Sequence, residues 1–175
     1  MKTSVRTVVL TGLVLGAVLG MAGTMVGGQP LRAVLWGIDG TGLIVATSLL
    51  ALVHFRAGND LAAGGFLVYA IGEAVMLGGT AMTPDASVPT FAAGTALWAA
   101  ALAITAIAGE FPVWSRAASL IGTVLFAIVA LRDFAGQMIT PLNRPLPYFA
   151  YPFLVLTFVG WGVWVLRRGE ITGQS

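Results

Sequence analysis

The sequence predicts an all-α, polytopic integral membrane protein with a single transmembrane domain over residues 1–175. The first observation is the composition: 58% of the residues are hydrophobic and only 9% are charged, whereas a soluble domain carries about a quarter charged residues. The second is that the apolar residues form runs of about 20, the length that a helix needs to cross a bilayer. The third is that breaks rich in proline and glycine, which end helices, separate these runs. We therefore expect one compact bundle of helices in the lipid bilayer.

Six spans are predicted, and turn residues separate each span from the next. The spans cover residues 5–26, 31–55, 61–82, 91–108, 112–135 and 148–166. The longest connection, 136–147, carries three prolines and cannot be regular helix. We expect it to lie across or dip into one mouth of the bundle.

The first span has two interpretations. Lys2 and Arg6 before an apolar run are typical of a secretory signal peptide. The apolar stretch continues to Val26, which is longer than a typical signal core, and the segment GMAGT is a weak cleavage site. We favour an uncleaved first helix over a cleaved signal.

Glycines recur every four residues in the first span, at Gly12, Gly16 and Gly20. Stripes of small residues with this spacing let helix backbones approach closely in lipid. We favour packing within the bundle; the alternative is a homodimer formed through this glycine-rich helix.

The second and third spans each contain a carboxylate, Asp39 and Glu73. Asp39 lies eight residues into its span from Leu31, and Glu73 lies nine residues before Met82, near the end of its span. At the helical rise these positions are about 12 and 14 Å from the same side of the bundle. Unpaired carboxylates are costly in lipid, and acids inside membranes are often functional. The shared depth of these two acids is therefore the strongest functional signal in the chain.

Aromatic and basic side chains are predicted to surround the two acids. Trp36 and Tyr69 precede Asp39 and Glu73 by three and four residues and so share their helix faces. Trp98 in the fourth span lies at a similar level. Arg132 in the fifth span has a long side chain, which we expect to reach inward and neutralise one of the acids. The predicted site is an outward-facing cavity lined by Asp39, Glu73, Tyr69, Trp36, Trp98 and Arg132.

Each of these residues also has a structural interpretation. Acids and an arginine inside a membrane can form an ion-pair network that only fixes helix packing. Tyr148 and Tyr151 are typical of an aromatic belt at the membrane surface. His54 is the sole histidine and lies beside Arg56 near a helix end, so we expect an ordinary interfacial residue.

The residues that the chain lacks exclude many chemistries. Without cysteine there is no disulfide, thiolate nucleophile or cysteine-ligated metal, and one histidine cannot form a bis-histidine haem, a histidine-rich zinc site or a di-iron centre. Lys2 is the only lysine, so a Schiff base inside the bundle is excluded. Hydrolase, zinc-protease, P-loop and dinucleotide motifs do not occur. We expect no cofactor and no metal site.

The basic residues predict the orientation. With six spans, one side holds Lys2, Arg6, Arg56, Arg116, Arg167 and Arg168, and the other holds Arg32, Arg132 and Arg144. Positive charge is enriched on the cytoplasmic side, so both termini should be cytoplasmic. Because these charges sit at helix ends, the net charge of +2 does not indicate nucleic-acid binding.

We expect a multi-pass protein of a bacterial inner (plasma) membrane. The segments GFLVYAIGE and PLPYFAYPFLVLT resemble those of small bacterial membrane proteins, and this resemblance implies no activity.

A weak internal repeat is also predicted. The segment GTGLIVATSLLAL from Gly40 resembles GTALWAAALAITA from Gly94, and a second alignment matches Pro84 with Pro141. The second and third helices would then be a parallel copy of the fourth and fifth.

Three functions remain open. The best supported is a transporter-like protein that binds a proton, a cation or a cationic small solute at Asp39 and Glu73 from the outer side. The alternative is a non-enzymatic structural or accessory subunit whose intramembrane charges pair internally. The third is a membrane enzyme that uses Glu73 as acid or base on a lipid-soluble substrate. No known catalytic motif in the sequence supports this third function.

Overall fold

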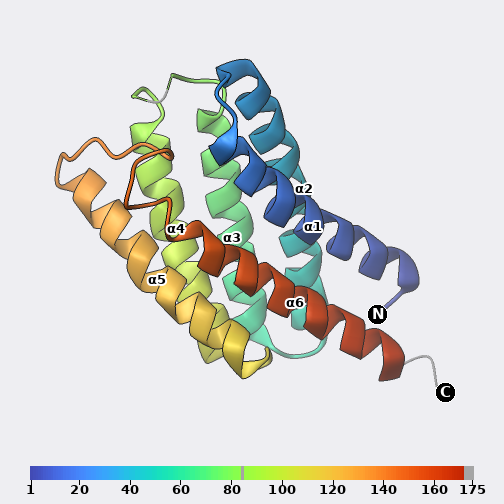
Figure 1. Cartoon of the computed structure of the whole chain (residues 1–175). Helices are drawn as coiled ribbons and strands as arrows, with labels where there is room; N and C mark the ends of the chain where they lie inside the picture. Colours follow the sequence, from blue (N-terminus) through green and yellow to red (C-terminus); the bar gives the residue numbers. More distant parts are fainter. Residues whose placement is uncertain (84, 172–175) are drawn as a thin grey trace.

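The computed structural model describes residues 1–83 and 85–171, and this part of the chain is all-helical. The helices within it are α1 (Thr3–Met25), α2 (Gln29–Arg56), α3 (Asp60–Gly79), α4 (Val88–Ile107), α5 (Val113–Phe134) and α6 (Tyr151–Ile171). They form one bundle in which the start of α1 and the end of α6 lie at the same end (Figure 1). We call this the termini end; the loop end is the opposite one, which holds the connections after α1, α3 and α5 (Figure 1).

The helices pack in the order in which they follow along the chain. Each helix contacts the next, and α1 also contacts α6, which closes the bundle. The core between them is rich in large aromatic side chains that are almost completely buried, among them Phe66, Tyr69, Phe126 and Trp161. Aromatic rings fill the interior where the small residues of the helices leave space.

Five helices of the described residues, α1 to α5, are long and apolar enough to cross a membrane. Their outward faces expose large apolar side chains, including Val14, Val18, Leu67, Val124 and Leu131. A soluble monomer rarely exposes so much continuous apolar surface, whereas lipid tails cover such surfaces readily. These features support the prediction of a helical membrane protein.

Four predicted helix ends differ from those observed by three residues or more, among them the start of the fourth helix, at Val88 rather than Phe91, and the end of the last, at Ile171 rather than Leu166. The third helix ends at Gly79 rather than Met82, and Thr80 closes it with its backbone N–H bonded to Leu77 O. The last helix begins at Tyr151 rather than Tyr148, because the prolines of the preceding connection hold the chain in turns. That connection is irregular, as predicted, and the Asp133 side chain anchors it by accepting a 2.7 Å hydrogen bond from Ile139 N.

The glycine stripe of α1 packs against α2 within the same chain. A Cβ atom on Gly12 would overlap the backbone at Gly42, and one on Gly16 would overlap the side chain of Leu43. Close approach of the two helices therefore depends on these glycines, as the favoured interpretation predicts. Association of two copies stays a prediction.

The order of the helices is compatible with the predicted internal repeat but does not test it. The pairs α2–α3 and α4–α5 are both hairpins of neighbouring helices, which is the arrangement that the repeat requires. The proposed match of Pro84 with Pro141 involves a residue outside the described ones. The repeat therefore stays a prediction.

The prediction that His54 is an ordinary interfacial residue is wrong. Its side chain is only 1% exposed and stacks on Trp164, with ring centroids 4.4 Å apart, and on Phe66 at 5.3 Å. Phe111, in the connection between α4 and α5, packs on the same imidazole at 5.8 Å. Side chains from three other segments thus cover a residue whose position near a helix end indicated exposure.

Candidate functional site

A pocket of about 120 Å³ lies toward the loop end of the bundle, between α1, α2, α3, α4 and α6. Five of the six residues predicted for the site line it: Trp36, Asp39, Tyr69, Glu73 and Trp98. We call it the acid pocket. The comparison of helix depths thus correctly places the two carboxylates, which come from neighbouring antiparallel helices, in one cavity.

Asp39 enters the acid pocket from α2, beside α1. Its side chain is 9% exposed and lies against Gly20, where a Cβ atom would be 2.9 Å from Asp39 Oδ2. The other oxygen, Oδ1, is buried and has no hydrogen-bond partner among the described residues. A polar atom in this state is costly unless water, a proton or a ligand satisfies it.

Glu73 enters the pocket from α3 and is 4% exposed. Its Oε1 atom lies beside the α2 backbone, 3.3 Å from where a Cβ atom on Gly40 would be, directly after Asp39. The Tyr69 hydroxyl and the Trp98 indole nitrogen are close to the carboxylate but do not reach good hydrogen-bond geometry. In the described part of the chain, Glu73 Oε2 and both of these donors remain unpartnered.

Aromatic rings form the walls around the acids. Tyr69 and Trp98 are parallel, with an interplanar angle of 2° and ring centroids 5.9 Å apart. Phe126 packs on Trp98 edge to face at 5.3 Å, and Trp161 packs on Tyr69 at 5.5 Å. These contacts hold the Tyr69 and Trp98 rings in place. Trp36 is fixed separately by its indole N–H, which donates to Gly20 O at 3.2 Å.

Arg32 lies at the mouth of the pocket and was missed by the sequence-based prediction. Its Nε donates to Gly23 O at 3.1 Å and its Nη2 donates to Val26 O at 2.5 Å, which ties the end of α1 to α2. The guanidinium also lies 5.8 Å from the Trp36 ring centroid. Arg32 precedes Asp39 by seven residues, two helical turns, so the shared helix face could have indicated its place.

Tyr151 and Gly20 are among the further lining residues that sequence reasoning missed. Tyr151 was expected in an aromatic belt, but it lines the acid pocket and its hydroxyl donates to Pro141 O at 2.9 Å. Pro141 and Leu142 also line the pocket. The long connection therefore covers part of the mouth, as its predicted position across one end of the bundle requires.

Arg132 does not join the acids, and the predicted ion pair is not formed. Arg132 is exposed, and its Nε donates to Gln137 Oε1 at 2.7 Å. The reason is the packing of α5, which in the described residues contacts α4 and α6 but neither α2 nor α3. No ion pair within the described residues neutralises Asp39 or Glu73; the pair that is present joins Glu110 and Arg168 near the termini end.

The chemistry of the pocket follows from these contacts. Two carboxylates share a mostly apolar cavity, and neither forms an ion pair within the described residues. Such an arrangement can hold a proton or a cation. No third carboxylate or histidine joins them among residues 1–83 and 85–171 to complete a metal-binding group.

No protein-family model, curated protein or solved structure matches the chain. The function is therefore inferred from the chemistry of the acid pocket.

Proposed function

We propose that this protein is a transporter-like membrane protein that binds a proton, a cation or a cationic small solute at Asp39 and Glu73. One observation carries the proposal. Both carboxylates are at least nine-tenths buried, both line one pocket, and each keeps an oxygen without a hydrogen-bond partner among the described residues. An internal ion-pair network, which the structural alternative requires, would leave these oxygens paired.

All six helices cross the membrane in this proposal, with the loop end outside and both termini in the cytoplasm of a bacterial cell. Six basic residues support this orientation because they lie toward the termini end: Lys2, Arg6, Arg56, Arg116, Arg167 and Arg168. The 21 residues of α6 measure about 31 Å at the helical rise, enough to cross the hydrocarbon core. The acid pocket then takes its ligand from the outer side.

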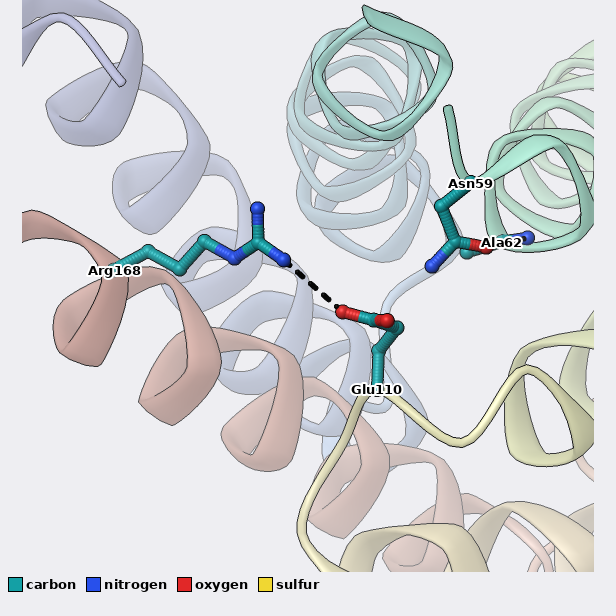
Figure 2. Close-up of polar contacts among 4 residues, drawn as sticks. All are labelled: Asn59, Ala62, Glu110 and Arg168. Atoms are coloured by element: carbon teal, nitrogen blue, oxygen red, sulfur yellow. Dashed lines mark hydrogen bonds and ion pairs between the residues drawn. The ribbon is translucent and has the colours of Figure 1, made fainter. Parts of the chain in front are cut away.

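A cluster of aromatic rings packs on the side of the pocket that faces the termini end. His54, Phe66 and Trp164 stack there, and Phe111 and Trp161 pack around them. Beyond this cluster Arg168 Nη2 and Glu110 Oε2 form an ion pair at 3.1 Å (Figure 2). In this proposal the cluster is the barrier on the cytoplasmic side of the pocket, as one state of an alternating-access cycle requires.

Flux through proteoliposomes tests the proposal. Purified protein is reconstituted into liposomes; proton flux is read with a pH-sensitive dye inside, and the uptake of radiolabelled Na⁺ and n-butylammonium is measured above that of protein-free liposomes. We expect the wild type to carry at least one of these cations and Glu73→Gln to lose that flux, because the site loses a carboxylate. The matched control is Asp60→Asn, which makes the same change at the exposed start of the same helix. Equal fluxes and equal pH dependence for Glu73→Gln and wild type would lead us to abandon the proposal.

A further inference from the structure

The acid pocket offers a cation two carboxylates in a lining that is otherwise mostly apolar. Hard metal ions take six or more oxygens, usually from several carboxylates, carbonyls and waters. Here Asp39 and Glu73 supply the carboxylates of the lining, and the hydroxyls of Thr24, Thr80 and Thr90 donate to carbonyls of their own segments. An ammonium group needs fewer acceptors, because it carries at most three hydrogen-bond donors and two carboxylates can accept all of them.

The aromatic walls add a second kind of cation contact. Tryptophan is the best partner for a cation over a ring face, and Trp36 and Trp98 both line the pocket with Tyr69. The Trp36 ring already has the Arg32 guanidinium 5.8 Å from its centroid. Arg32 already occupies the Trp36 ring, so Trp98 and Tyr69 are the wall rings that have no cation over them among the described residues.

Most of the remaining lining is apolar and the space is small. Met21, Met76, Leu77, Leu154 and Val155 are among the residues that line the cavity. Its volume of about 120 Å³ is close to that of an apolar cavity of about 150 Å³ known to hold benzene. The site therefore has room for roughly six heavy atoms, most of them carbon.

We infer that the ligand of the acid pocket is a small organic ammonium ion, whose charged nitrogen lies at Asp39 and Glu73 and whose hydrocarbon part lies against the aromatic and aliphatic walls. This inference rests on the proposed function, because it names the class of cation that the same site binds. Arg32 takes no part in holding the ammonium ion; its hydrogen bonds to Gly23 and Val26 fix the end of α1.

Calorimetric titration of the full-length protein in detergent tests the ligand class. The probes are n-butylammonium, its neutral counterpart n-butanol, NaCl and the zwitterion glycine betaine. We expect n-butylammonium to bind more tightly than each of the other three, since it alone combines one positive charge with an apolar chain. Equal or tighter binding of n-butanol, Na⁺ or the betaine would overturn the inference.

Variants of one wall residue separate binding from folding. Trp98→Leu should weaken n-butylammonium binding roughly 5- to 30-fold, which corresponds to the loss of a desolvated cation–π contact. Trp98→Phe keeps a ring and should retain part of the affinity. The matched control is Trp114→Leu, since Trp114 is 46% exposed and does not line the acid pocket. Unchanged affinity in Trp98→Leu and Trp98→Phe would also overturn the inference.

The two proposals fail in different ways. If n-butylammonium does not bind but Na⁺ or a proton binds and Glu73→Gln abolishes that binding, the ligand class is wrong and the proposed function stands. If Glu73→Gln leaves the binding of every cation unchanged while the wild type binds one, the proposed function is wrong and the inference falls with it.

Discussion

Gly20 of α1 and Asp39 of α2 are in direct contact: a Cβ atom on Gly20 would lie 2.9 Å from Asp39 Oδ2. The glycine spacing of α1 and the buried acid of α2 are separate features of the sequence. In the structure they lie against each other. Gly12 and Gly16 bring the two helices together, and Gly20 leaves the space that the carboxylate occupies. A substitution on α1 should therefore disturb the acid pocket, as a substitution of the acids does.

Gly20→Ala should displace the Asp39 carboxylate and weaken cation binding. We expect a fall in affinity of roughly tenfold, equivalent to about 1.4 kcal/mol, measured by calorimetric titration. Stability should hold, because alanine favours a helix over glycine by about 1 kcal/mol and the displaced atoms end a movable side chain. Gly37→Ala is the control, since a Cβ atom there meets nothing within 4 Å. The same loss in Gly37→Ala, or none in Gly20→Ala, would contradict this prediction.

His54 should act as a packing residue of the aromatic cluster. Its ring nitrogens have no hydrogen-bond partner in the described part of the chain, so His54→Phe, which keeps a ring between Phe66 and Trp164, should not lower the free energy of unfolding. His54→Ala should lower it by about 2–4 kcal/mol, because it leaves a cavity. Unfolding of both variants in detergent checks this. A large loss in His54→Phe would show that an imidazole nitrogen makes an essential bond.

The sequence predicts well how deep a side chain lies along the bundle, and predicts poorly which way that side chain points across the bundle. The helices and the shared level of Asp39 and Glu73 follow from the 1.5 Å rise of a helix and short turns, and both acids do line one pocket. Which way a side chain points across the bundle depends on which helices are neighbours. That packing turns Arg132 away from the acids and buries His54. Apolar periodicity does not determine it when lipid covers the outside and both faces of a helix are apolar.

Arg32 and Arg132 should differ in their effect on stability. Arg32→Gln removes two hydrogen bonds that tie α1 to α2, and we expect a loss of about 1–3 kcal/mol in the free energy of unfolding. Arg132→Gln removes one exposed contact with Gln137 and should cost less than about 0.5 kcal/mol, with cation affinity unchanged. Parallel unfolding curves measure both. A strong effect of Arg132→Gln on cation binding would restore the predicted pairing of Arg132 with the acids.

The orientation of the bundle can be tested cleanly because the chain has no cysteine. Ala86→Cys places a thiol in the exposed connection after α3, and Ala57→Cys places one in the connection after α2. In intact spheroplasts, a membrane-impermeant maleimide should label Ala86→Cys and leave Ala57→Cys unlabelled until the cells are lysed. The reverse pattern would place the acid pocket on the cytoplasmic side.

The stability of Glu73→Gln, with and without a cation, tests most directly whether the acids form a binding site. A buried carboxylate that serves ligand binding lowers the stability of the ligand-free protein. Glu73→Gln in detergent should therefore melt at the same temperature as wild type or higher. Adding n-butylammonium should raise the melting temperature of wild type and of the Asp60→Asn control but not that of Glu73→Gln. A lower melting temperature for Glu73→Gln, with no cation-dependent rise in wild type, would contradict the account and assign the acids to helix packing.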